Sequence, residues 1–389
     1  MAHFKPYILI FLAFLASAGA FAQPGNQWIN YDLQHWRFPV AQKGWMQLSY
    51  ADLQNAAISV NGVNPDALKI FAKERQVFAR VEDGGDGSFD PGDFLEFWAT
   101  PNNGWLDAQI YDDPSHQAHP DYSLFNDTLH YFLTVDPAAD AFRTAQFESP
   151  TDPNSLTTHP WVWSGVSETY QAEYLFGVQD QYGIALPWYQ EGEGWFDNRF
   201  SKGQTRNKLI PTPFPFTGPD APNAQVHAVS TSASLAVGIL NHHLQVGYGT
   251  GFNVMVDTAF YGYQLNTFNF EIPHTAIQPA GTLISHRSID DLGVATDYQA
   301  VGSIEVNYAR TLNMSGVSTL YFEVENLNNS AETKLVFTNV ATTNPRLIEQ
   351  GPGAPREFPV VQNGANWEAI VPFSPDPSSI RLILTDGND

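Results

Sequence analysis

The sequence predicts an all-β protein made of two β-sandwich, jelly-roll-like domains with little helix. Three observations lead to this fold class. Phe, Tyr and Trp make up 14% of the residues, Gly and Pro together contribute 29 and 27 of the 389, and only 15% of the residues are charged. Aromatic residues favour strands, while Gly and Pro favour the turns between them. Short alternating or apolar segments separated by turn formers are typical of sandwiches.

Residues 1–22 are predicted to be a signal peptide. Lys5 provides the positive end, Tyr7 to Leu15 form an apolar run, and Ala20-Phe21-Ala22 is a small-residue cleavage pattern. Outside this segment, no stretch of the chain approaches the roughly 18 apolar residues that a membrane-spanning helix needs. We therefore expect an exported protein, in the periplasm or outside the cell, with no membrane span.

Charge and cysteine content limit the classes of function. The chain has 18 Lys and Arg against 41 Asp and Glu, which gives a formal net charge of −23. Nucleic acid and anionic membrane surfaces would repel such a chain, whereas cations would be attracted. There is no cysteine, so the fold must stand without disulfides and no thiol nucleophile is present.

The predicted order of elements starts with a β domain over residues 23–150. Ser49 is a good N-cap for one short helix in the segment that follows it. A proline-rich stretch, 148–155, reads as a linker, and a second β-sandwich domain is expected over 151–389, with an irregular loop at 211–222. The predicted strands include 129–135, 225–230, 244–246, 252–256, 267–272, 303–308, 319–324 and 334–337.

The stretch VEDGGDGSFDPGDFLEFWA, residues 81–99, predicts a β-hairpin with arms at 81–82 and 94–98. Asp83, Asp86, Asp90 and Asp93 fall within its connecting loop. An EF-hand is excluded, because the third ligand position is a glycine and the bidentate glutamate is replaced by aspartate. Two interpretations stay open: the aspartates make turns through their side chains, or they bind Ca²⁺ as the one cofactor that the sequence suggests.

Tryptophans next to acidic residues suggest a second class of function. Trp163 lies in a predicted strand, and Trp195 follows Glu191 and Glu193 in the segment YQEGEGWFDNRF. Exposed indoles stack on sugar rings, so Trp163 and Trp195 are the candidate contacts of a secreted carbohydrate-binding module. Packing in the core is the alternative use of these aromatic rings. Paired carboxylates also suit sugar hydrolysis, but a solvated acidic loop is the better explanation in so acidic a chain.

Several motifs in order resemble the N-terminal, non-catalytic region of the gingipain-like cysteine peptidases, and most closely the sortase of the type IX secretion system. The first is GWMQLSYADL (44–53), which is followed by NPDALKIF (64–71). DGSFDPGDFLEF (86–97) is similar to the family's Asp-Gly-x-Phe-Asp hairpin, and YSLFNDTLHYFLT (122–134) to its next strand. GWFDNRF (194–200) and IEVNYAR (304–310) fit its second domain.

The resemblance implies a supporting role. The family's peptidase domain lies downstream of this region and uses a Cys/His pair, and this chain is expected to end before such a domain. We therefore expect no enzymatic activity, and a scaffold that supports a peptidase domain or docks protein partners of the secretion pathway. The chain could be part of a longer peptidase or a separate product, and the sequence does not decide between them.

Overall fold

The computed structural model describes residues 26–119, 121–138, 140–179, 182–236, 238–351, 353–373 and 378–385. The predicted signal peptide lies outside these residues. The all-β sandwich prediction is confirmed, because antiparallel sheets dominate and the described residues contain a single α-helix, α2 (Tyr50–Asn55). None of the helical segments in the described ranges has the length and apolar character required to cross a bilayer.

The chain divides into two compact units. The first comprises the described residues up to Val40, together with Gln47–Trp98 and Leu129–Arg143. The second comprises Ala41–Met46, Ala99–Thr128 and the described residues from Thr144 onward.

The first unit is a small sandwich. One sheet has the order β1-β7-β3-β4, and most of a second sheet, β2-β6-β5, belongs to the same unit. The sheets pack through aromatic rings, since Phe97 lies 5.5 Å from Tyr131 and 6.1 Å from Phe38, measured between ring centroids. Their strands are β1 (His35–Val40), β2 (Gly44–Ser49), β3 (Leu68–Ala72), β4 (Arg75–Val77), β5 (Ala79–Glu82), β6 (Phe94–Ala99) and β7 (Leu129–Val135).

The predicted N-cap is confirmed in this unit. The Ser49 hydroxyl accepts a hydrogen bond from the Asp52 amide, and the Asp52 carboxylate accepts one from the Ser49 amide. This reciprocal pair satisfies two amides that the helix itself cannot satisfy. Leu53 is the buried residue that anchors the helix to the unit.

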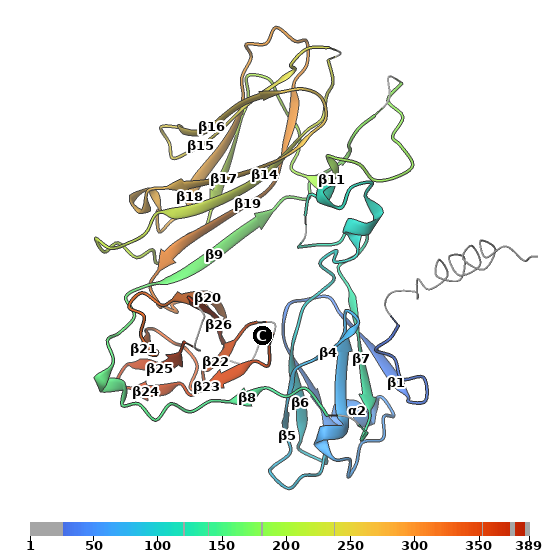
Figure 1. Ribbon diagram of the computed structural model, residues 1–389, viewed down its shortest axis with the longest axis vertical. Helices are drawn as coiled ribbons and strands as arrows, with labels where there is room; N and C mark the ends of the chain where they lie inside the picture. Colours follow the sequence, from blue (N-terminus) through green and yellow to red (C-terminus); the bar gives the residue numbers. More distant parts are fainter. Residues whose placement is uncertain are drawn as a thin grey trace, which may run out of the picture. The chain divides into compact units, whose positions relative to one another are not determined.

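The larger sandwich of the second unit has two sheets. The first contains the strands β17-β14-β19-β9 in this order (Figure 1), and the short strand β12 pairs with β19. A second sheet, β13-β18-β15-β16, packs against it. Buried side chains from both sheets, such as Val226, Ile304, Leu244 and Ile284, form one core. The strands are β9 (Val162–Thr169), β12 (Phe200–Ser201), β13 (Thr205–Ile210), β14 (Ala224–Ser232), β15 (His242–Tyr248), β16 (Asn253–Phe260), β17 (Leu265–Ile272), β18 (Thr282–Ser288) and β19 (Tyr298–Arg310).

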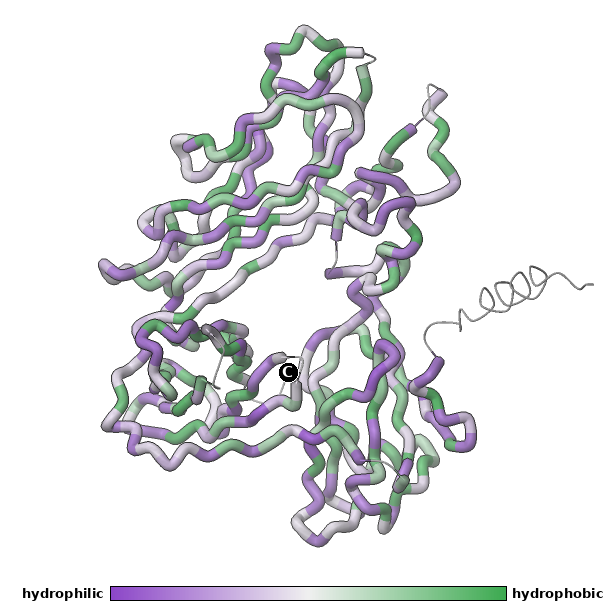
Figure 2. The backbone as a smooth tube through the Cα atoms, viewed as in Figure 1, coloured by the Kyte–Doolittle hydropathy of each residue, from purple (hydrophilic) through white to green (hydrophobic). Residues whose placement is uncertain are grey.

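The first sheet continues past β9 into a second core of the same unit. β20 follows β9, and β26, β22, β23 and β8 complete the sheet, which packs on the sheet β21-β25-β24. Buried positions alternate with partly buried ones along β20 and β21, as expected for sheets with one buried face. Hydrophobic and hydrophilic residues are interspersed along the chain in this region (Figure 2). The strands are β8 (Ala145–Gln146), β20 (Leu320–Glu325), β21 (Glu332–Phe337), β22 (Arg346–Glu349), β23 (Arg356–Phe358), β24 (Val361–Asn363), β25 (Asn366–Pro372) and β26 (Ser379–Thr385).

A loop-rich segment, 99–128, belongs to the second unit and packs on the hairpin of β10 (Glu173–Phe176) and β11 (Glu193–Phe196). Ala118 shares a buried cluster with Leu175 and Phe196. The Tyr111 hydroxyl donates to the Glu193 carbonyl oxygen over 2.9 Å, which ties the segment to the start of β11.

Candidate functional sites

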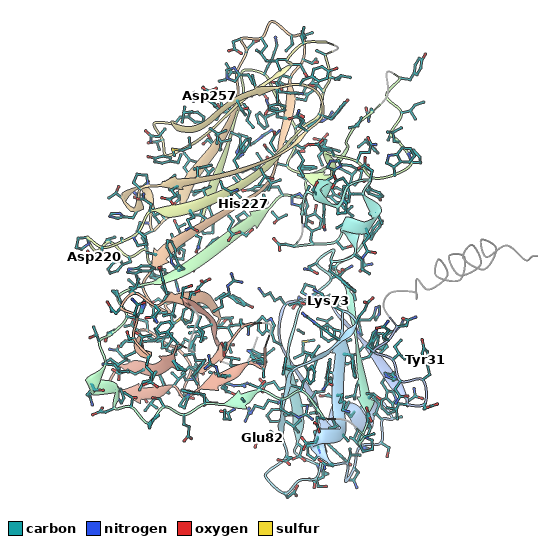
Figure 3. All side chains as sticks on the ribbon, in the orientation of Figure 1. Tyr31, Lys73, Glu82, Asp220, His227 and Asp257 are labelled. Atoms are coloured by element: carbon teal, nitrogen blue, oxygen red, sulfur yellow. The ribbon has the colours of Figure 1, made fainter. Side chains whose placement is uncertain are left out.

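The predicted hairpin at residues 81–99 is confirmed. β5 and β6 pair antiparallel, with Val81 opposite Leu95 and Glu82 opposite Phe94. Glu82, labelled in Figure 3, stands where β5 ends and the acidic loop begins. The base of the hairpin is held by the Tyr50 amide, which donates to the Asp93 carbonyl oxygen over 2.8 Å.

The loop aspartates bond to the backbone amides around them. The Asp83 carboxylate accepts from the amides of Gly85 and Gly87 over 3.0 and 3.1 Å. Asp86 accepts from the Ser88 amide over 2.9 Å, and the buried Asp93 accepts from the Asp90 amide over 2.6 Å. These bonds are the side-chain turns that the first interpretation of the aspartates requires.

Electrostatic repulsion nevertheless remains in the loop. The pKa of Asp90 is raised above its ordinary value, by desolvation first and then by the negative charges of Asp86 and Asp93. No group of three or more His, Asp or Glu side chains within the described ranges is arranged to hold a metal ion. Calcium binding by Asp83, Asp86, Asp90 and Asp93 therefore stays the untested alternative to side-chain turns.

Trp195 lies on β11, in the hairpin that receives the segment 99–128. Its half-buried indole meets the Tyr174 ring edge-on, with 5.4 Å between the centroids. Its backbone carbonyl oxygen accepts hydrogen bonds from His119 Nε2 over 2.7 Å and from the Tyr122 hydroxyl over 3.3 Å. Burial lowers the pKa of His119 to about 4, although the bond to the carbonyl opposes this shift, so the ring is a neutral donor near pH 7.

The carboxylates around Trp195 also have structural partners. Glu193 accepts from the Tyr174 hydroxyl over 2.9 Å, and burial raises its pKa despite that bond. Glu191 accepts from the Leu265 amide over 2.9 Å, and Asp197 lies 2.7 Å from Lys208 Nζ. Each of the three carboxylates therefore contacts a different element of the second unit and supports its packing.

Trp163 lies on a different sheet from Trp195, because β9 belongs to the large sheet of the second unit and β11 pairs with β10 alone. It is half-buried on β9, its ring meets Trp161 edge-on at 5.2 Å, and its Nε1 donates to Glu325 on β20 over 3.0 Å. Trp163 and Trp195 therefore occupy separate strands with separate partners. Sugar stacking by either indole stays a prediction.

The two adjacent histidines of β15 point to opposite sides, as the alternation of a strand predicts. His242 is buried and its Nδ1 lies 2.6 Å from Asp297. His243 contacts Asp257 at 2.7 Å and Asp291 at 2.8 Å. Burial opposes the charged form of His243, but the hydrogen bonds that its ring donates to both aspartates raise its pKa overall.

Sequence reasoning missed a groove on the outer face of the sheet β17-β14-β19. Its polar lining comes from positions two residues apart on each of three strands: Gln225 and His227, Asn269 and Glu271, Glu305 and Asn307. The alternation of polar and apolar residues within each strand can be seen in the sequence and indicates one polar face. The sequence does not indicate that the three strands are neighbours, because long stretches of chain separate them.

No protein-family model matches the chain, and no curated protein matches it. Among solved structures, dimeric latent PorU from Porphyromonas gingivalis is similar with a TM-score of 0.52 and 13% identity, over 90% of this chain and 31% of that one. The infectious bursal disease virus Gx strain structure gives a TM-score of 0.21 at 12% identity, covering 96% of this chain and 85% of that one. The isomalto-dextranase of Arthrobacter globiformis T6 gives 0.19 at 8% identity, with 70% and 34% covered. Only the first of these TM-scores is high enough to indicate a shared fold. The chain therefore has a PorU-like β architecture and spans 31% of the length of PorU.

Proposed function

We propose that this chain is an exported, non-catalytic scaffold that supports a peptidase domain or docks protein partners of a type IX secretion pathway. The observation that carries the proposal is the fold likeness to PorU, a type IX sortase, over 90% of this chain. The order of motifs from GWMQLSYADL to IEVNYAR supports it independently, because that order is a property of the sequence and does not depend on the fold.

The chemistry of the chain favours support over catalysis. A cysteine peptidase requires a thiolate activated by a base, and the 389 residues include no cysteine. Glu191, Glu193 and Asp197, the most suggestive acidic group, each hold a neighbouring element in place. Their contacts are those of a structural loop.

The proposal can be tested by fragment complementation. PorU lacking the region that matches this chain would be produced separately and mixed with this chain, and the mass of the product measured by size-exclusion chromatography with light scattering. We expect a stable complex, because a scaffold with the same architecture should present similar docking surfaces. PorU's own matching region serves as the positive control.

The two arms of this experiment decide the matter together. If PorU's own region rejoins the truncated protein and this chain does not, the scaffold proposal for this chain is wrong. If this chain joins as well, a supporting role for a peptidase domain gains direct evidence.

A further inference from the structure

The groove on the outer face of the larger sandwich has the dimensions of a ligand site. Its volume is about 530 Å³, within the roughly 300–1,000 Å³ of small-molecule sites. It lies over β17, β14 and β19, all in the second unit. His227, labelled in Figure 3, projects from β14, the central strand of the three.

The strand register aligns the polar lining in two rows. In one row His227 lies opposite Asn269 on β17 and opposite Glu305 on β19. In the next row Gln225 lies opposite Glu271 and Asn307 in the same manner. Because positions two apart face the same side of a strand, six polar side chains rise from one surface.

A glycine at the edge of this surface leaves space beside the carboxylate. Gly165 on β9 lies opposite Asn307, and a Cβ placed on it would come within 3.2 Å of Glu305 Oε1 and 4.0 Å of Asn307 Oδ1. A side chain here would therefore crowd the Glu305 carboxylate and displace it by a few tenths of an ångström, while it would only touch Asn307. Strands usually disfavour glycine, so its presence matters for the space that it leaves.

Three of the six polar side chains that line the groove have no partner within the described residues. His227 Nδ1 is paired with Asn269 Oδ1 over 2.7 Å, and Glu271 accepts a long bond from Asn223 over 3.4 Å. Within the described part of the chain, the side chains of Gln225, Glu305 and Asn307 make no hydrogen bond or ion pair. The groove therefore presents two amides and a carboxylate that are accessible to a ligand and are not engaged by another side chain.

From this arrangement we infer that the groove binds a neutral glycan. Free amides offer both donors and acceptors and a carboxylate offers strong acceptors, which together suit hydroxyl groups that donate and accept at once. The two glutamates and the net charge of −23 repel phosphorylated or sulfated ligands. The side chains of Val226 and Phe270 pack into the core behind the sheet, so the groove offers a ligand polar side chains.

The site differs from the tryptophan positions that the sequence suggested. Trp163 shares the outer face with Gly165, but its indole bonds to Glu325 on β20, on the side of β9 away from β19. Recognition in the groove would therefore rest on hydrogen bonds to hydroxyls. The inference does not depend on the scaffold proposal.

The test is isothermal titration calorimetry of the full chain with linear neutral oligosaccharides of glucose, galactose, mannose and xylose. Two variants remove the site. Gly165→Val fills the space beside Glu305 with a residue that strands favour, and Asn307→Ala removes one free amide. Ala259→Val adds similar bulk at an exposed position on β16 of the opposite sheet and is the matched control.

We expect saturable binding of at least one oligosaccharide, weakened about tenfold or more by Gly165→Val and by Asn307→Ala and unchanged in Ala259→Val. No saturable binding across the panel would overturn the inference. So would binding that survives both groove variants, binding lost only in Trp195→Ala, or a groove that responds to Ca²⁺ and to none of the sugars.

Discussion

The Nδ1 atom of His242 lies 2.6 Å from Oδ1 of Asp297, and both side chains are buried in the larger sandwich. The same carboxylate accepts from the Ser288 hydroxyl over 2.7 Å and from Gln299 Nε2 over 3.1 Å. These donors compensate for the water that Asp297 loses on folding. The network joins β15, β18 and β19, so it fixes one sheet of the sandwich against the other.

Asp297→Ala is therefore expected to be severely destabilising. It leaves the buried donors of His242, Ser288 and Gln299 without their shared acceptor, and each buried donor left unsatisfied costs about 1–3 kcal/mol. Urea unfolding measures the change. Asp291→Ala, which removes one of the two exposed partners of His243, is the control and should cost about 1 kcal/mol or less. Equal effects of the two substitutions would contradict a structural role for the buried network.

A buried histidine on β18 should make the second unit acid-sensitive. Burial, and next the positive charge of Lys208, lowers the pKa of His286 from 6.5 to about 3. Neither ring nitrogen has a hydrogen-bond partner among the described residues. Below pH 6.5 His286 binds a proton in the unfolded chain but stays neutral in the folded chain. The free energy of unfolding therefore decreases as the pH falls from 6.5 toward 3.

The expected slope for this one group approaches about 1.4 kcal/mol per pH unit within that window. His286→Leu should flatten the dependence of the unfolding free energy on pH, because it removes the group that titrates. Urea melts of both proteins at several pH values between 7 and 4 measure this. Parallel curves would show that other groups dominate the acid response.

We expect the acidic hairpin to be equally stable with and without calcium. Backbone amides already engage the carboxylates of Asp83, Asp86 and Asp93. We expect the same melting temperature in millimolar Ca²⁺ and in chelator. A rise with Ca²⁺ that disappears in Asp86→Ala and in Asp90→Ala, with the fold intact, would establish the metal site instead.

Purified protein should be catalytically silent toward peptides. With no thiol in the sequence, it should neither cleave Arg- or Lys-linked reporter peptides nor react with thiol-directed labels. Fluorescence release and mass spectrometry check both points. Turnover that is abolished by substituting a serine or a glutamate would refute the non-catalytic proposal.

Local chemistry in the sequence predicted local structure well. Ser49 predicts the helix that it caps, and the glycines and aspartates between two apolar arms predict the hairpin at 81–99. These features depend on residues only a few positions apart, so a short stretch of sequence contains their causes.

Sites that depend on strand pairing could not be predicted in this manner. His227 and Glu305 are partners only because β14 lies beside β19, and His242 reaches Asp297 only because the chain returns to β15 after 55 residues. His286 reads as one more polar position in a strand, TLISHRS. Its burial follows from the sheet packed over it, which no local pattern specifies.

Strand β9 contributes to two cores at once, with Val162 in one and Val166 packed against the other. It is bonded to β19 on one side and to β20 on the other. Loss of either core would strip this strand of half its support and expose apolar surface of the remaining core to water. The parts of the second unit built around these two cores should therefore unfold together, in a single cooperative step, under heat, denaturant or mechanical pulling.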